Sequence, residues 1–194
     1  MKVALHLLVI TLFGSVLAEG EPMLEAVSKL DAEGDSGVSG MVSFSQEPGQ
    51  PVKVEALVAG LTPGKHGFHI HTEGPTEAGC ASTGPHYNPT EKPHGGPGNP
   101  DRHVGDLGNI EADEEGNATL DITDDMISLS GEHSIIGRAV VIHAKEDDLG
   151  TTDPAQMGNA GAKVACGIIE LVEESALRLI SFGVVSFAML LTMY

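Results

Sequence analysis

The chain has 194 residues, enough for one domain with a substantial hydrophobic core and short targeting segments. Glycine occurs 25 times, aromatic residues make up 4% and tryptophan is absent, which favours short strands joined by turns over a helical bundle. The formal net charge of −18 argues against a nucleic-acid partner, and it would repel an anionic substrate unless a local positive patch attracts it.

The N-terminus has the features of a secretory signal peptide. Lys2 supplies a positive start, residues 3–16 are mostly apolar, and Ala18 offers a small residue for cleavage. A short buried helix is the weaker interpretation, because polar residues follow the apolar run directly. We therefore predict a signal peptide at residues 1–18, a folded domain at residues 19–174, and a secreted, extracellular protein.

The next part of the chain contains short strand-like segments separated by turn residues. Alternating or β-branched apolar side chains mark residues 38–45, 52–58, 118–123, 138–144 and 164–172. Turn-forming Gly, Pro, Asp and Ser lie between or before them, as at residues 33–37 and 48–51. With no long helical period, the sequence predicts an all-β domain, either an antiparallel sandwich or a barrel. Residues 67–106 and 145–162 resist assignment to strands and are predicted as two long functional loops.

The first of these loop regions is unusually rich in histidine. It holds five of the nine histidines in the chain: His69, His71, His86, His94 and His103. Imidazole is the commonest protein ligand for copper and zinc, and glycines and prolines hold a long loop in fixed turns. The alternative is a solvated, histidine-rich surface loop that binds metal only adventitiously.

The spacing of these residues suggests two metal-binding groups. His69 and His71 are two residues apart, so on a strand both rings project from one face and could bind one ion. His143, in a strand-like segment, could reach the same ion from a neighbouring strand. Three nitrogens and one carboxylate oxygen, a suitable tetrahedral zinc shell, come from His86, His94, His103 and Asp106. This spacing is not a diagnostic zinc pattern, so the residues alone leave the solvated loop open.

The cysteines, the C-terminus and one asparagine carry further signals. Cys80 and Cys166 are either buried thiols or a disulfide, and the secretory N-terminus favours the disulfide. Residues 175–194 form an apolar tail that could tether the protein to the cell surface, either as a removed glycolipid-anchor signal with Ser175 as attachment site or as a transmembrane helix. The helix, residues 179–194, would be short, with about 16 residues against the usual span of about 20. Asn117 begins a glycosylation sequon, Asn-Ala-Thr.

Several motifs resemble the copper–zinc superoxide dismutases: G-F-H-I-H, A-G-C-A-S-T-G-P-H-Y-N-P, R-H-V-G-D-L-G-N, V-V-I-H and G-N-A-G-A-K-V-A-C-G. They occur in family order, and the resemblance covers roughly residues 26–172. It implies a Greek-key β-barrel or flattened sandwich, usually a homodimer, with copper and zinc as cofactors. The implied reaction is the dismutation of superoxide to oxygen and hydrogen peroxide by a redox-cycling copper, while zinc organises the loop.

The resemblance also implies roles for individual residues. Copper would be bound by His69, His71, His86 and His143. Zinc would be bound by His86, His94, His103 and Asp106. His86 would therefore bridge both metals and carry a proton in the reaction. Asp147 matches the aspartate that links His69 to His94, and Cys80 and Cys166 match the family disulfide.

Near the copper site, Lys163 takes the position of an arginine in the family. Lysine keeps the positive charge but lacks the planar guanidinium of arginine, which carries several hydrogen-bond donors. The neighbouring residues 151–157 contain no lysine or arginine. The resemblance therefore predicts a working enzyme with weaker guidance of the superoxide anion.

Two other classes of protein remain as alternatives. A non-catalytic copper-binding or copper-delivery module on the same fold would lack copper ligands or carry additional cysteines. A surface-tethered structural domain would need only the zinc group for stability. All the expected copper positions are filled and the chain has only two cysteines, so the sequence favours the enzyme.

Overall fold

The computed structural model describes residues 21–152 and 158–173. The predicted signal peptide and C-terminal tail lie outside these residues. Within the two described ranges, no helix is long and apolar enough to cross a membrane. The described residues form nine strands and one short 3-10 helix: β1 Leu24–Ala32, β2 Ser39–Gln46, β3 Val52–Ala59, β4 Gly64–His71, η1 Cys80–Thr83, β5 Asp106–Ala112, β6 Ala118–Asp124, β7 Ala139–His143, β8 Lys163–Ile168 and β9 Glu170–Leu171.

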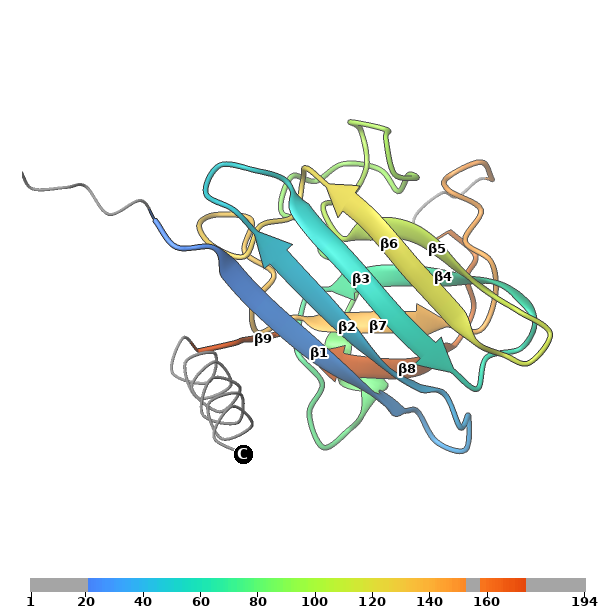
Figure 1. The fold of residues 1–194 in the computed structure, drawn as a ribbon. Coiled ribbons are helices and arrows are strands. Elements are labelled where there is room, and N and C mark those ends of the chain that lie inside the picture. The colour runs from blue at the N-terminus through green and yellow to red at the C-terminus, as the bar shows by residue number, and fades with distance from the viewer. Residues whose placement is uncertain (1–20, 153–157, 174–194) are drawn as a thin grey trace, which may run out of the picture.

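The strands form a closed antiparallel barrel (Figure 1). Their order is β2-β3-β6-β5-β4-β7-β8-β1, and β1 pairs again with β2 to close it, while β9 pairs with β1. Four pairings join strands that are not consecutive: β3 with β6, β4 with β7, β1 with β8 and β1 with β9. This connectivity is a Greek key, and it confirms the predicted all-β Greek-key barrel.

Side-chain alternation explains how the strands build the core. On β3, Val52, Val54, Ala56 and Val58 are buried, while the residues between them face outward. On β4, Phe68 and Ile70 belong to the same hydrophobic core. Because successive side chains of a strand point to opposite faces, His69 and His71 lie on the outside of the barrel wall, where the long loops cover them.

The observed strands differ from the predicted ones in four places. β4 includes residues 67–71, which were assigned to the loop, because glycine and histidine interrupt its apolar pattern. β1 was not predicted, because small side chains, Ala26 and Ser28, fill two of its buried positions and weaken its apolar pattern. β5 begins at Asp106, which was assigned to the loop, since charged and glycine residues conceal the start of this strand. The predicted strand 164–172 is divided at Ile169 into β8 and β9.

Candidate metal centre

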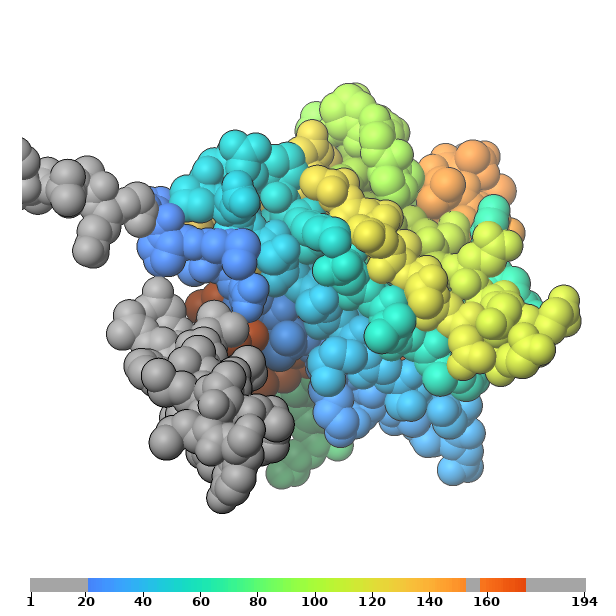
Figure 2. Space-filling view, viewed as in Figure 1, coloured from blue at the N-terminus to red at the C-terminus, as the bar shows by residue number. Residues whose placement is uncertain are grey.

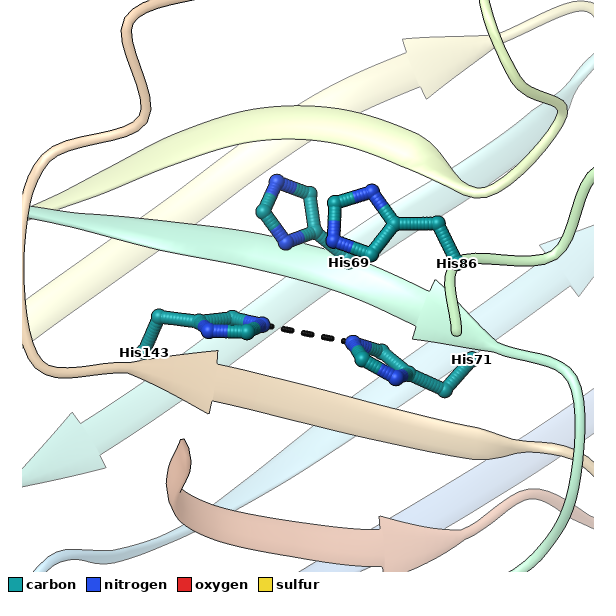
Figure 3. Close-up of side chains that lie close together, drawn as sticks. All are labelled: His69, His71, His86 and His143. Carbon is teal, nitrogen blue, oxygen red and sulfur yellow. Dashed lines mark hydrogen bonds between the residues drawn. The ribbon is translucent and has the colours of Figure 1, made fainter. Parts of the chain in front are cut away.

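The four residues predicted to bind copper come together on the outer face of β4 and β7 (Figure 3). β4 supplies two of them, β7 supplies one, and His86 comes from the loop between β4 and β5, where it pairs with His71 in an isolated bridge. One ring nitrogen of each residue lies within 4.8 Å of those of the others, and all four residues are buried: His69, His71, His86 and His143.

Hydrogen bonds hold three of these rings through their outer nitrogens. The acceptors are Asp147 Oδ2 for His69 Nε2 at 2.6 Å, the carbonyl of Gly84 for His71 Nδ1 at 2.8 Å, and the carbonyl of Gly161 for His143 Nδ1 at 3.1 Å. Such bonds fix the tautomer and the orientation of a ligating imidazole. The inner nitrogens, His69 Nδ1, His71 Nε2 and His143 Nε2, therefore carry no proton. Their lone pairs are directed toward one point.

The inner nitrogens of this group fit a metal ion. His69 Nδ1 and His86 Nε2 are buried without any hydrogen-bond partner. His71 Nε2 and His143 Nε2 lie 3.2 Å apart (Figure 3). Buried polar atoms without partners are costly, and four imidazole nitrogens around one point are the donor set that copper prefers.

A second group forms around Asp106, the first residue of β5. Its Oδ1 lies 2.8 Å from His86 Nδ1 and 3.1 Å from His103 Nδ1. Its Oδ2 lies 2.9 Å from His94 Nδ1, which nevertheless makes no hydrogen bond. Three imidazole nitrogens and one carboxylate fit the four-coordinate shell of a structural zinc. His86 presents one ring nitrogen to each group, so the two groups share this imidazole.

Asp147 links the two groups from the loop between β7 and β8. It is buried, and its two carboxylate oxygens accept hydrogen bonds from His69 Nε2 at 2.6 Å and His94 Nε2 at 2.7 Å. The side chain of Asn109 on β5 holds the backbone of Asp147 through both its amide and its carbonyl. Gly158 packs against this carboxylate with φ +66°, and a side chain there would overlap Asp147 Oδ1.

Arg102 supports the second group, although sequence reasoning did not single it out. Only 2% of this arginine is exposed. Its Nη1 donates to the carbonyl of Asp106 at 2.9 Å, and its Nη2 pairs with Asp124 at the end of β6. Arg102 therefore anchors the start of β5 to the barrel. The only sequence signal was its place in the motif R-H-V-G-D, because its partner lies 22 residues away.

The two groups differ in their protonation. Burial lowers the pKa of His69 to about 3 and that of His143 to about 4, so both rings are neutral at pH 7. Burial also lowers the pKa of His94, but the carboxylates of Asp106 and Asp147 outweigh it and raise that pKa to about 9. In the metal-free protein at pH 7, His94 is therefore an imidazolium held between two carboxylates.

This difference predicts a proton release that is specific to zinc. Binding up to one equivalent of zinc to the metal-free protein must remove the proton from His94 Nδ1, so we expect about one proton released at pH 7. The apparent zinc affinity should rise about tenfold per pH unit and level off near pH 9, where His94 is already neutral. Calorimetry in buffers of different ionisation enthalpy measures this release.

The control for this experiment is Asp147→Asn, which removes one of the charges that raise the pKa of His94. In this variant the zinc affinity should level off below pH 9. A zinc affinity that is independent of pH between 7 and 9 in the unsubstituted protein would contradict the assignment.

Lys163, at the start of β8, lies beside the first group. Its ammonium donates three hydrogen bonds, to the carbonyls of Cys80 at 3.1 Å and Gly84 at 2.9 Å and to Thr83 Oγ1 at 2.8 Å. Burial lowers the pKa of Lys163, against a smaller opposing effect of Glu33. Because an ammonium has three N–H groups, these acceptors use all of its donors. The Gly84 carbonyl also accepts from His71, so Lys163 supports a residue of the first group.

The predicted disulfide joins Cys80 and Cys166, which confirms the pairing. It ties η1, in the loop between β4 and β5, to β8. Glu33 Oε2 also accepts a hydrogen bond from the backbone N–H of Cys80, at 2.8 Å. The segment that carries Gly84 and leads to His86 is therefore fixed to the barrel covalently and by hydrogen bonds.

A Greek-key barrel that gathers two histidine groups around a shared imidazole defines a class of protein built for a pair of metal ions. Comparison with known families agrees: residues 38–169 match the profile of the copper/zinc superoxide dismutases. The match spans more than half of the chain, so the chain belongs to the copper/zinc superoxide dismutase family. The cofactors of this family are copper and zinc.

Proposed function

We propose that this chain catalyses the dismutation of superoxide to oxygen and hydrogen peroxide. The observation that carries the proposal is the set of inward-facing nitrogens of the first group, two of them buried without any partner. A structural domain would need only the zinc group. The complete first group, in which imidazoles converge on one point, favours an enzyme with a redox metal.

Each group has its own part in the proposed reaction. Copper would be bound by His69 Nδ1, His71 Nε2, His86 Nε2 and His143 Nε2. Zinc would be bound by the Nδ1 atoms of His86, His94 and His103 together with Asp106. Copper bound there supplies the electron transfer, since zinc has no redox chemistry.

His86 is the proposed proton carrier. Its Nδ1 faces Asp106 in the second group, while its Nε2 faces the first group without a partner. Nε2 is therefore the atom that takes up a proton in one half of the cycle and donates it to the second superoxide. Of the four rings in the first group, only His86 also belongs to the second group, and this position between the two groups supports its proposed role.

The proposed activity is tested by metal analysis together with superoxide-consumption kinetics. We expect the protein loaded with copper and zinc to consume superoxide catalytically, and His143→Ala to lose this activity because one copper ligand is removed. His133→Ala is the matched control, since His133 belongs to neither group. Copper binding without turnover would support the copper-binding or copper-delivery module instead. Zinc binding without copper would support the structural domain.

The contacts of Lys163 sharpen the prediction of weak anion guidance. Because its three donors are used by protein acceptors, it offers charge but no free N–H to the substrate. Arginine carries five N–H groups, so Lys163→Arg should retain these contacts and add donors for the anion. We expect a higher rate constant for the variant, with a steeper decrease as ionic strength rises.

Lys92→Arg is the control for this comparison, because Lys92 pairs with Asp101 on the outside of the loop between β4 and β5. Rates are measured across a range of ionic strengths. Equal rates for Lys163→Arg and the unsubstituted protein would show that Lys163 does not weaken the guidance of the superoxide anion.

The location of the protein is a further proposal. Residues 1–18 support secretion, and the apolar residues 175–194 support attachment to the cell surface. Treatment of intact cells with a phospholipase that cleaves glycolipid anchors separates the cases: release indicates an anchor, retention a transmembrane helix, and protein already in the medium plain secretion. The homodimer stays a prediction, to be tested by sedimentation.

A further inference from the structure

One face of the barrel, formed by β1, β2, β3 and β6, carries an exposed apolar patch. This face is turned toward the viewer in Figures 1 and 2. Leu57 on β3 is 67% exposed and Met41 on β2 is 46% exposed. The two residues are direct partners across the β2–β3 pair, and Leu57 lies opposite Thr119 on β6. We define the Leu57 patch as Met41, Leu57 and Thr119.

The Leu57 patch departs from the pattern of its own strand. Of the other outward positions on β3, two carry Lys53 and Glu55, as expected for a solvated strand face, and the last carries the small Ala59. At the patch, Met41 and Leu57 border a shallow groove of roughly 340 Å³ that Ser43 and Thr119 also line. Large apolar side chains that adjoin on a surface, with polar residues around them, form a small apolar patch that another molecule can cover.

Asn117, the first residue of the glycosylation sequon, lies beside this patch. It ends the turn between β5 and β6, where its backbone N–H donates to Asp113 Oδ1 at 2.7 Å and its carbonyl accepts from the Asp113 N–H at 2.9 Å. Asn117 and Thr119 are both exposed, and neither side chain has a hydrogen bond within the described ranges. The turn is therefore held by the backbone of Asn117, which leaves its side-chain amide available.

Strand register places Asn117 on the same face as the patch. The β3–β6 pairing runs through Leu57 with Thr119 and Val58 with Ala118. One residue further along this pairing, Asn117 lies beside the end of β3. Because side chains two residues apart on an extended chain point to the same face, we infer that Asn117 and Thr119 face the same way. Two residues of extended chain span about 7 Å, so a group attached to Asn117 can reach the patch directly.

We propose that Asn117 carries an N-linked glycan whose first sugars cover the Leu57 patch. In the attachment step, Nδ2 of Asn117 attacks the anomeric carbon of an oligosaccharide linked to a lipid pyrophosphate. A C–N bond forms, the C–O bond to the pyrophosphate breaks, and the proton lost by Nδ2 leaves with the lipid pyrophosphate. The acetyl methyl group and C–H faces of the first sugars contact Met41 and Leu57, while their hydroxyls remain solvated.

The chemistry of the surrounding surface favours a sugar as the occupant. A second copy of this chain, with a formal net charge of −18, would bring another acidic protein against this face, where the two carboxylates of Glu55 and Asp121 share the one ammonium of Lys53. A glycan brings no charge. It is also already positioned, because the sequon lies on the strand that forms one side of the patch.

The experiment uses the full chain expressed in eukaryotic cells that glycosylate secreted proteins. Peptide mass mapping should find a glycan at residue 117 in the unsubstituted protein and in Thr119→Ser, which keeps the sequon, but none in Asn117→Gln. Compared with Thr119→Ser, Asn117→Gln should then bind a hydrophobic fluorescent dye with about a twofold or greater increase in signal. Adding Leu57→Ser to Asn117→Gln should remove that increase.

Three results would overturn the proposal. If Asn117 is unmodified in the unsubstituted protein, the proposed glycan does not exist. Equal dye binding by Asn117→Gln and Thr119→Ser shows that the glycan does not cover the patch. A glycosylated protein that dimerises in sedimentation and becomes monomeric with Leu57→Ser assigns the patch to a second copy. None of these variants contacts the metal centre, so superoxide consumption per copper should not change, and the outcome is independent of the proposed activity.

Discussion

Replacement of Asp147 by alanine is expected to weaken the binding of both metals by about 10–100-fold. One carboxylate orients His69 in the first group and His94 in the second, with oxygen to nitrogen distances of 2.6 Å and 2.7 Å. Without it, both rings lose the acceptor that selects their tautomer. The fold should persist, because Asn109 holds the backbone of Asp147 rather than its side chain.

Metal affinities measured by competition with chelators test this prediction, and Asp148→Ala is the matched control. Asp148 is the next residue, but its carboxylate accepts from Asn159 and the Gly150 N–H rather than from a histidine. We expect activity of Asp147→Ala to recover in part at saturating copper and zinc. Equal affinities in the two variants would show that Asp147 does not orient the ligands.

Loss of the disulfide is expected to have the largest effect on stability. Cys80 and Cys166 are 86 residues apart, so the bond closes a long loop in the unfolded chain. On the loop-entropy model, the double variant Cys80→Ser/Cys166→Ser should lower the free energy of unfolding by about 4–5 kcal/mol. Urea unfolding of the metal-free protein measures this change, because bound metals would add their own stabilisation.

Loss of the disulfide should also affect the metal centre. The Cys80 carbonyl accepts from Lys163, and the same lysine donates to Gly84, whose carbonyl orients His71. Freeing η1 should therefore weaken copper binding as well. The unsubstituted protein under reducing conditions is the control, since it lacks the bond but keeps both cysteines. A decrease below about 1 kcal/mol in both samples would contradict the entropic contribution.

Local patterns were sufficient for most of the barrel. Alternation in residues 52–58 and 118–123 correctly predicted β3 and β6, because one face of each strand packs against the core. The same reasoning missed β1, whose buried positions include Ala26 and Ser28, and β5, which begins at the polar Asp106. It also assigned most of β4 to a loop, because histidines alternate with Phe68 and Ile70 there. In these strands tertiary packing, rather than a run of large apolar side chains, determines the buried positions.

The sequence by itself determined the all-β class and the candidate ligands, because strand alternation and histidine spacing are local properties of the chain. The family, and with it the division of the ligands into two metal sites, came from the resemblance of its motifs. Tertiary structure alone decided which ring nitrogens face inward, since the orientation of each ring depends on a hydrogen-bond acceptor from a distant part of the chain. Asp147 is 78 residues from His69. Lys163 is 83 residues from Cys80, whose carbonyl accepts one of its three hydrogen bonds. The register that sets Thr119, two residues after Asn117, opposite Leu57 likewise arises only when β3 and β6 pair. Contacts between distant segments form when the barrel closes, and no local pattern encodes them.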